Sequence, residues 1–389
     1  MMPAVSARTP PPDAVRRRRL VVVALALLAL IAGAAVGAGG GSETPPERGG
    51  AGGARPATAP PKAATAAVDR LPLEQQVGQL VVLRFAGTTA PSYVTRALAE
   101  RRVAGAILFR DNLTGPQQAT ALAGALRRAG GEPRPIVCVD QEGAAIRILP
   151  WSPPARSQPA QGAAQSAGPD ARAAARSLLS QGVDVALAPV ADVPIAGSAM
   201  GGRQFSDDSA TAARDVAAAV RGWRAGGVAP TLKHFPGLGG ATVNTDDGPA
   251  TVSRSRTQLD ADLAPFRAGI AAGAPLVMVS SAFYTALDRT RIAAQSRAVI
   301  DGLLRRQLGF KGVAVTDSLE AAAVRAVGDV EAASVASVAA GMDLILTTGR
   351  GSYIHVYRAL LARARADRGF RARVRESAAR VLALRETLR

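Results

Sequence analysis

The sequence predicts a single large domain of the (β/α)8 TIM-like barrel class, spanning residues 68–389. Short apolar runs alternate with Ala-rich, Arg-bearing amphipathic segments from residue 71 onward, and this alternation is typical of repeated β–α units that build a parallel sheet. Roughly 320 residues for eight such units also fall within the size range of these barrels. An open, doubly wound sheet is the alternative, because one sequence alone does not fix the number of strands.

Three segments precede this domain. Residues 1–19 form a basic N-terminal region that ends in four adjacent arginines. Residues 20–38 are an apolar run long enough to span a bilayer, and a positively charged flank before such a run is typical of a signal peptide or a transmembrane anchor. Residues 39–67 are rich in Gly, Pro and Ala, which predicts a flexible linker. Both interpretations of the apolar run predict an exported protein, either secreted or membrane-anchored with its body outside.

Eight apolar runs predict the strands of the barrel, and amphipathic segments between them predict its helices. The strands are expected at Val77–Phe85, Gly105–Phe109, Pro135–Val139, Val183–Val190, Val228–Leu232, Pro275–Val279, Gly312–Val315 and Met342–Leu346. Helices are expected at Ala119–Arg128, Ala210–Ala225, Thr257–Ala272, Val299–Leu308 and Val330–Ala340, with a last one over Phe370–Leu388. The stretch after the third strand is less regular.

Each of the eight apolar runs closes in polar residues. They are Arg84, Arg110-Asp111, Asp140-Gln141-Glu142, Asp192, Lys233-His234, Ser280-Ser281, Asp317-Ser318 and Thr347-Thr348. Polar residues also mark where a strand leaves the core, but this explains one or two ends more easily than eight. Because barrel active sites lie at the C-terminal ends of the strands, we expect these side chains to converge on one pocket.

The strongest chemical signal is the pair Lys233-His234, since the chain has only three Lys and two His residues. A Pro-Gly-x-Gly-Gly turn follows this pair and permits close approach of the backbone to a ligand. With Asp140 and Arg203, the pair makes a polar set suited to binding vicinal hydroxyls through charge-assisted hydrogen bonds. The alternative is a plain strand end and turn, with His234 satisfied in the core.

Several other partners are disfavoured. The net charge of +17 suits an anionic partner, but the body has no Lys/Arg run interleaved with aromatics, so no nucleic-acid partner is expected. Two distant His residues and the single Cys138 give no metal-ligand spacing. Gly237–Gly240 is not followed by the Lys-Ser/Thr of a phosphate-binding loop. We therefore expect neither a metal nor a cofactor.

Several ordered motifs resemble glycoside hydrolase family 3, in particular its single-barrel β-N-acetylglucosaminidase (β-N-acetylhexosaminidase) type. The motifs are Asp140-Gln141-Glu142-Gly143, Ala188–Val193, Gly202–Phe205, Lys233-His234-Phe235-Pro236-Gly237, Leu303–Gly312 and Thr316-Asp317-Ser318-Leu319. The resemblance covers nearly the whole predicted domain.

The resemblance implies a retaining glycosidase in which Asp317 is the nucleophile and forms a covalent glycosyl-enzyme. Asp140, Arg203, Lys233 and His234 would hold the hydroxyls of the terminal sugar. The implied substrate is terminal β-linked N-acetylglucosamine, or a related β-sugar, of cell-wall glycans, as in peptidoglycan turnover. Taken without the resemblance, Asp317 is more readily interpreted as a helix N-cap.

One departure concerns the proton donor. The resembled enzymes carry an Asp-Ser-His whose His is the general acid/base, and the ungapped alignment places Asn244, Thr245 and Asp246 there. In the first hypothesis Asp246 transfers the proton, with its pKa raised by Asp247 or by burial. In the second, the barrel has lost efficient catalysis and acts as an envelope glycan-binding or regulatory protein. In a third, another carboxylate supplies the proton, and the candidates are Glu142 and Glu320. The presence of Asp317, the nucleophile that the resemblance implies, favours the first hypothesis.

Further departures affect specificity. After Gly143 the resemblance implies Gly-Arg-Val-x-Arg-Leu, but residues 144–149 keep neither arginine in register. Ser280-Ser281 also stands where the family often has a His. Substrate choice is therefore expected to differ in part.

Overall fold

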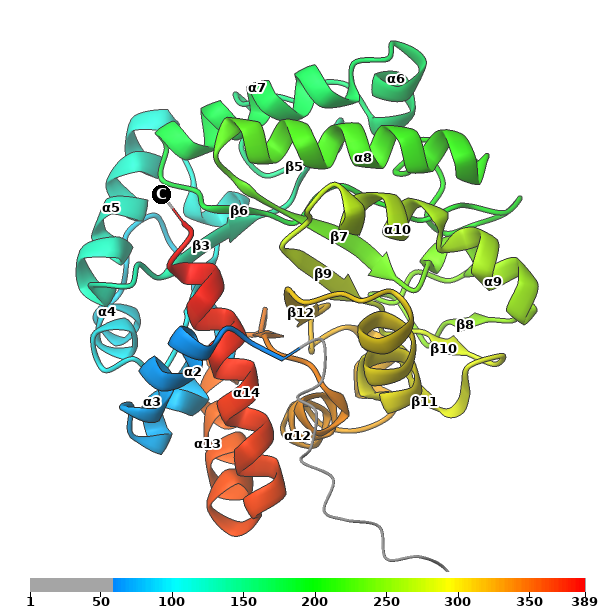
Figure 1. Ribbon diagram of the computed structural model, residues 1–389. Coiled ribbons are helices and arrows are strands. Elements are labelled where there is room, and N and C mark those ends of the chain that lie inside the picture. The colour runs from blue at the N-terminus through cyan, green and yellow to red at the C-terminus, as the bar shows by residue number, and fades with distance from the viewer. Residues whose placement is uncertain (1–58, 389) are drawn as a thin grey trace, which may run out of the picture. The chain divides into compact units, whose positions relative to one another are not determined.

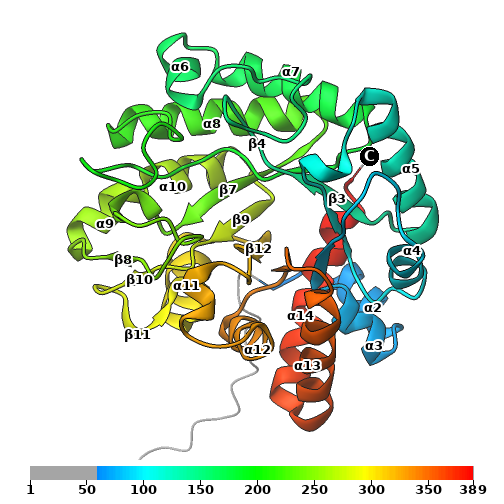
Figure 2. The same ribbon diagram turned by 180° about the vertical axis from the view of Figure 1, so that it is seen from behind.

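The structure is a computed structural model that describes residues 59–388. Eight parallel strands form its central sheet (Figures 1 and 2). In chain order they are β1 (Val81–Arg84), β2 (Gly105–Ile107), β3 (Ile136–Val139), β6 (Val185–Ala186), β7 (Ala229–Phe235), β9 (Leu276–Val279), β12 (Val313–Thr316) and β13 (Ile345–Leu346). Each expected run overlaps one of them. Six of the expected runs were longer than the observed strand, because apolar residues continue into helix ends and loops that are also buried. The other two strands, β7 and β12, continue past the expected ends at Leu232 and Val315.

The sheet closes on itself, which confirms the barrel and excludes the open doubly wound alternative. Its strands are hydrogen-bonded in the order β12-β9-β7-β6-β3-β2-β1-β13. A parallel bridge between Val315 and Leu344 joins the two ends of this order. Counting around the ring, β1 is four strands from β7 in either direction, and β3 is likewise four strands from β12. The ends of these two strand pairs therefore face each other across the mouth of the barrel.

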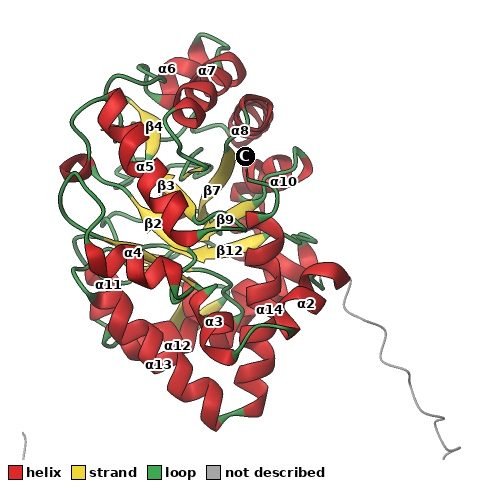
Figure 3. Ribbon diagram, turned by 90° about the vertical axis from the view of Figure 1, so that its left-hand side faces the viewer, coloured by secondary structure: helices red, strands yellow, loops and turns green. Residues whose placement is uncertain are grey.

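Helices surround the strands on the outside (Figure 3). Those between residues 59 and 227 are α2 (Lys62–Asp69), α3 (Leu73–Gly78), α4 (Ser92–Ala99), α5 (Pro116–Gly130), α6 (Gln158–Ala163), α7 (Ala167–Ser180) and α8 (Ser209–Gly226). Those that follow are α9 (Arg256–Asp262), α10 (Ala264–Ala271), the π-helix η4 (Ala298–Gln307), α11 (Ala322–Arg325), α12 (Val330–Ala340), α13 (Ser352–Ala366) and α14 (Arg368–Arg385). Short 3-10 helices lie at η1 (Arg110–Asn112), η2 (Leu238–Gly240) and η3 (Ala293–Gln295).

Five minor strands belong to loops at the barrel mouth and its edge. They form a two-stranded sheet of β4 (Gln141–Gly143) and β5 (Ile146–Arg147), and a three-stranded sheet of β8 (Thr251–Val252), β10 (Phe283–Tyr284) and β11 (Asp288–Ile292). The two-stranded sheet, together with α6 and α7, accounts for the less regular stretch after the third barrel strand.

Successive side chains along each strand point alternately into the barrel and toward the helices, and this alternation divides the core into two layers. In β9, Leu276 and Met278 belong to the cluster inside the barrel, whereas Val277 and Val279 belong to the cluster between strands and helices. This follows from the two-residue period of a strand, whose successive side chains point to opposite faces. The inner cluster forms the floor beneath the barrel mouth, because Met278 also lines the pocket described below.

Two expectations need correction. The predicted linker ended at residue 67, but Lys62–Asp69 forms helix α2. Its Ala64 and Val68 are buried in the core, so packing overrides the Ala- and Thr-rich composition. The helix expected over Thr257–Ala272 is two helices, since α9 ends before Pro265 and a proline donates no hydrogen bond to the preceding turn. The apolar run 20–38 lies outside the described residues, and no helix of residues 59–388 is long and apolar enough to cross a membrane.

Candidate active site

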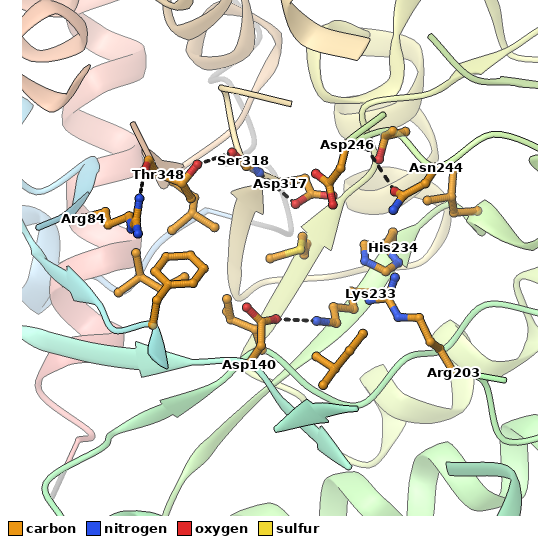
Figure 4. A pocket seen from close by; sticks show the side chains of 18 residues that line it. Arg84, Asp140, Arg203, Lys233, His234, Asn244, Asp246, Asp317, Ser318 and Thr348 are labelled. Carbon is orange, nitrogen blue, oxygen red and sulfur yellow. Dashed lines mark hydrogen bonds and ion pairs between the residues drawn. The ribbon is translucent and has the colours of Figure 1, made fainter. Parts of the chain in front are cut away.

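A pocket of about 470 Å³ opens at the C-terminal ends of the barrel strands (Figure 4). All six residues that the sequence placed in the site line it: Asp140, Arg203, Lys233, His234, Asp246 and Asp317. The other lining residues are Arg84, Ile107, Phe109, Ile146, Leu187, Leu238, Asn244, Thr245, Met278, Ser318, Leu346 and Thr348. The expected convergence of strand ends is thus observed for Arg84, Asp140, Lys233-His234, Asp317-Ser318 and Thr348.

Lys233 and Arg203 form a network with two carboxylates on one side of the pocket. The Nζ atom of Lys233 lies 2.6 Å from Asp140 Oδ1 and 2.6 Å from Glu142 Oε1. Arg203 binds both oxygens of Glu142, at 2.7 Å through Nη2 and 3.0 Å through Nε. The buried Lys233 and the half-buried Arg203 are thus both matched by a carboxylate, which holds these long side chains in place.

Glu142 is a structural anion rather than a proton donor. Burial opposes its ionisation, but the charges of Lys233 and Arg203 outweigh burial and lower its pKa to about 2. A carboxyl with such a pKa is ionised at neutral pH and has no proton to give. The sequence identified Glu142 only as a strand-end residue and a possible donor. Its structural role depends on the side chains around it, which motif and spacing do not specify.

His234 is oriented by Asp192, a residue of the predicted strand ends that had no assigned role. Asp192 is fully buried and accepts hydrogen bonds from the backbone N–H groups of His234 (3.1 Å) and Leu238 (2.7 Å). Its other oxygen lies 2.8 Å from Nδ1 of His234. The imidazole is therefore fixed through Nδ1, while the residue itself lines the pocket. The turn after it requires Gly239, where a Cβ would lie 1.9 Å from the carbonyl oxygen of Val193.

Asp317 follows β12 directly, and its Oδ1 accepts a hydrogen bond of 2.8 Å from the N–H of Ser318. Asp246 comes from the loop after η2, at the exposed mouth of the pocket. The carbonyl oxygens of Thr245 and Asp246 accept hydrogen bonds from the N–H groups of Ala323 (3.0 Å) and Ala322 (3.3 Å). The loop is thereby tied to the segment that follows the nucleophile candidate. Figure 4 shows the carboxyl groups of Asp246 and Asp317 next to each other.

The pKa of Asp246 is raised above its ordinary value. The first cause is partial burial of its carboxyl group, and the second is the negative charge of Asp317. His234 and Arg203 act in the opposite direction, and Asp247 adds a smaller upward contribution. Both causes named in the first hypothesis act in the expected direction, but Asp317 contributes more than Asp247. A carboxyl that keeps its proton to higher pH is better suited to general acid catalysis.

The opposite wall of the pocket carries Arg84 and Thr348, two strand-end residues for which the sequence predicted no individual role. Arg84 lies over the ring of Phe109, 4.8 Å from its centroid, and donates to the carbonyl oxygen of Thr348 at 3.3 Å. Glu320 accepts hydrogen bonds from the Thr348 N–H (2.7 Å) and hydroxyl (3.0 Å). Glu320 is not among the residues that line the pocket, so it is poorly placed to donate a proton to a bound sugar.

A closed parallel barrel whose mouth holds two carboxyl groups beside a set of charged side chains has the architecture of a barrel glycosidase. The chain belongs to glycosyl hydrolase family 3: the family described as "Glycosyl hydrolase family 3 N terminal domain" matches residues 72–384. This confirms the resemblance, and the protein is a glycoside hydrolase.

Relatives and solved structures agree with this assignment. The chain is 36% identical over 278 residues to a β-hexosaminidase of Stenotrophomonas maltophilia, covering 69% of this chain and 82% of that protein. It superposes on a family 3 β-N-acetylglucosaminidase from a Paenibacillus species with a TM-score of 0.77 at 34% identity, covering 82% of this chain and 62% of the other. A β-N-acetylhexosaminidase from Beutenbergia cavernae gives a TM-score of 0.76 at 34% identity, covering 81% and 99%.

Proposed function

We propose that the protein removes terminal β-linked N-acetylglucosamine, or a closely related β-sugar, from glycans with retention of configuration. The observation that carries this proposal is the adjacent pair Asp317 and Asp246 beside the network of Asp140, Lys233 and Arg203. The names of the relatives, which are β-hexosaminidases and β-N-acetylglucosaminidases, support the choice of sugar.

The proposed reaction has two displacements. The carboxylate of Asp317 attacks the anomeric carbon, and the bond to the leaving-group oxygen breaks while Asp246 gives its proton to that oxygen. The product is a glycosyl ester on Asp317 and an ionised Asp246. Asp246 then removes a proton from water, the water oxygen bonds to the anomeric carbon, and the carboxylate of Asp317 is released.

The alternative, a glycan-binding barrel with impaired catalysis, requires that no group in the pocket can protonate the leaving group. The raised pKa of Asp246 and its position next to Asp317 favour catalysis over that alternative. The ionisation of Glu142 and the place of Glu320 outside the pocket lining favour Asp246 among the three candidate donors that the sequence offers.

The location and natural substrate form part of the proposal. The four arginines before the apolar run 20–38 support export, with the domain secreted or anchored outside the membrane. A net charge of +17 suits the anionic polymers of a cell envelope. We therefore propose fragments of cell-wall glycans as substrates. Fractionation of cells expressing the full chain should find it in the medium or the membrane, and recovery only from the cytosol would contradict export.

The catalytic roles can be tested with two aryl β-N-acetylglucosaminides, one with a dinitrophenyl and one with a phenyl leaving group. Asp317→Ala should abolish turnover of both substrates. Asp246→Ala should lower kcat/KM for the phenyl substrate by about 10²–10⁴-fold but for the dinitrophenyl substrate far less, because a good leaving group needs little protonation. With the dinitrophenyl substrate this variant should instead lose kcat, since hydrolysis of the glycosyl-enzyme lacks its base. Azide, which attacks the glycosyl-enzyme without a general base, should restore kcat and yield the glycosyl azide.

Asp247→Ala is the matched control, since Asp247 is the neighbouring carboxyl and does not line the pocket. An equal effect of Asp246→Ala and Asp247→Ala on the phenyl substrate would show that Asp246 is not the acid. Absence of turnover of either substrate by the wild type, with sugar binding unaffected by Asp317→Ala, would favour the glycan-binding alternative. Aryl β-glucosides assayed in parallel identify the sugar preference.

A further inference from the structure

A cavity of about 670 Å³ lies on the outside of the barrel, between η4, α12, α13 and α14. Figures 1 and 2 show the last three of these helices next to one another. We call this cavity the arginine cleft, because six arginines line it: Arg297, Arg305, Arg306, Arg363, Arg373 and Arg380. It shares no lining residue with the active-site pocket, and the proposed reaction gives it no role.

The arginine cleft lies toward the N-terminal end of the barrel, away from the mouth. Asp343, at the base of the cleft, lies just before β13 and accepts a hydrogen bond of 2.9 Å from the N–H of Ala314, near the start of β12. Arg305, near the C-terminal end of η4, also precedes β12. The active-site pocket opens at the other end of these strands. A ligand in the cleft would therefore leave the barrel mouth open to substrate.

Three arginines form the floor of the cleft, and two carboxylates hold them in place. Asp343 is fully buried and pairs with Arg305, with Arg380 at 3.1 Å and with Arg373 at 3.4 Å. Glu376 pairs with Arg373 at 2.9 Å and with Arg380 at 2.5 Å. Cations that are already fixed lose little conformational freedom when an anion binds to them. The floor is therefore preorganised for a negatively charged ligand.

Positive charge exceeds negative charge in the cleft. Its six arginines face three lining carboxylates, those of Asp301, Asp367 and Glu376, and Asp343 supplies a fourth from beneath. Two positive charges are thus left uncompensated. Arg306 is exposed and forms no ion pair with any residue that the structure describes. An anion that enters the cleft would relieve the repulsion among these cations.

The other arginines at the rim are accessible to a ligand. Arg297 pairs with Asp301 at 3.2 Å, and Arg363 pairs with Asp367 at 2.8 Å. The two arginine side chains are 78% and 53% exposed, so water screens both pairs. Because exposed pairs of this kind contribute little stability, a ligand with several oxygens can compete for these guanidinium groups.

The arrangement of the donors suits phosphate. The arginines come from three segments of the chain, which are residues 297–306, α13 and α14, so they approach the cleft from different directions. A phosphate group presents its oxygens in several directions and forms charge-assisted hydrogen bonds with guanidinium forks. Arginine clusters are a recurring means of binding phosphate-bearing ligands. The volume of the cleft also leaves room for a repeated or substituted phosphate.

We propose that the arginine cleft is a binding site for phosphate groups, which are carried either by an anionic polymer or by lipid headgroups. Binding there would hold the protein on a phosphate-bearing surface while the barrel mouth stays free. This inference goes beyond the proposed function and does not depend on it, because binding can be measured without turnover.

The first test titrates inorganic pyrophosphate into the full-length chain in a non-ionic detergent, with isothermal titration calorimetry as the readout. The wild type should bind pyrophosphate, and succinate, a dicarboxylate, should bind at least about tenfold more weakly. Arg306→Gln and Arg363→Gln should each raise the Kd for pyrophosphate by about tenfold, as expected for loss of one charge-assisted contact. Arg306→Lys should raise it less, because it keeps the charge without the planar fork. Both positions are exposed, so the fold should be kept.

Two controls remove the same charge elsewhere. Arg358 is exposed on α13 and does not line the cleft, and Arg84 lines the active-site pocket. Arg358→Gln and Arg84→Gln should both keep the wild-type Kd. An equal rise of the Kd in Arg358→Gln would show that net charge alone attracts the anion, and a rise in Arg84→Gln would place the anion in the active site. Either result would overturn the inference, as would equal binding of succinate and pyrophosphate, or a wild-type Kd in Arg306→Gln and Arg363→Gln.

Vesicles of phosphatidylglycerol and of phosphatidylcholine distinguish the two sources of phosphate. Stronger retention of the wild type on phosphatidylglycerol, lost in Arg306→Gln but kept in Arg358→Gln, would identify lipid headgroups. Equal retention on both lipids, together with pyrophosphate binding that depends on Arg306, would identify a polymer. A wild type that neither binds pyrophosphate nor prefers phosphatidylglycerol would overturn the inference. None of these measurements uses turnover, so their failure is distinguishable from failure of the proposed glycosidase reaction.

Discussion

The ion-pair network beneath the pocket allows a quantitative prediction for Glu142→Gln. The Glu142 side chain is 3% exposed, and its oxygens bind Arg203 and Lys233. Although burial opposes ionisation, these two charges lower the pKa of Glu142 from 4.5 to about 2. One pKa unit corresponds to about 1.4 kcal/mol, so the ionised carboxylate stabilises the folded protein by about 3 kcal/mol. Because the group is buried, solvent screening does not reduce this figure much.

The sign of the pH dependence follows from the direction of the shift. The folded-state pKa lies below the unfolded-state value, so the stabilisation is complete above about pH 4.5 and is lost as the pH falls toward 2. Glu142→Gln should therefore lower the free energy of unfolding by about 3 kcal/mol at pH 7, since the amide leaves Lys233 and Arg203 without their shared anion. The difference in the free energy of unfolding between Glu142→Gln and the wild type should shrink below pH 4.5.

Equilibrium urea unfolding at pH 7 and at a series of lower pH values measures both effects. The control is Glu132→Gln, whose side chain is 80% exposed and lies 3.7 Å from Arg134, so it should change the free energy by less than about 1 kcal/mol. A loss for Glu142→Gln no larger than that of the control would refute the reasoning. So would a loss that stays constant from pH 7 to pH 3.

Three further predictions concern catalysis and stability. For the phenyl substrate, kcat/KM should fall as the pH rises through the pKa of Asp246, because the proposed mechanism uses its protonated form. This decrease at high pH should be absent in Asp246→Ala. Asp343→Asn should lower the free energy of unfolding by about 3–5 kcal/mol in urea titrations, because it leaves three arginines around a buried site without their anion. Gly239→Ala should cost about 1–3 kcal/mol and reduce kcat/KM, since the new methyl group meets the carbonyl of Val193. Unfolding curves like those of the wild type would contradict the predictions for Asp343→Asn and Gly239→Ala. A decrease of kcat/KM at high pH that persists in Asp246→Ala would contradict the prediction for Asp246.

The barrel could be predicted from the sequence because its signals are local. Buried strands of a parallel sheet are short apolar runs, and the helices between them repeat apolar residues at helical spacing. What the sequence could not give were the features decided by packing. Helix α2 forms where composition indicates a linker, since Ala64 and Val68 meet the core, and the break between α9 and α10 depends on Pro265.

The site was predicted in part for a similar reason. Strand ends and motifs brought Asp140, Lys233 and Asp317 to one pocket, because every parallel strand delivers its last residues to the same end of the barrel. The roles of Glu142 and Asp192 were missed, although both stood at predicted strand ends. Their roles are defined by partners far away in the chain, and a single sequence does not show which strand-end residues become ion pairs and which remain free for substrate.

In the mechanism that we propose, the electrostatic coupling between Asp246 and Asp317 allows one carboxyl group to serve first as acid and then as base. In the free enzyme, partial burial and the charge of Asp317 raise the pKa of Asp246 and favour its protonated form. In the proposed glycosyl-enzyme, Asp317 is an uncharged ester, so the contribution of its charge disappears and the pKa of Asp246 should fall as Asp246 becomes a base. Asp317→Asn mimics this change of charge, and NMR titration of the Asp246 carboxyl should show a lower pKa than in the wild type. An unchanged or higher value in Asp317→Asn would mean that the two groups are not coupled and that burial alone sets the protonation of Asp246.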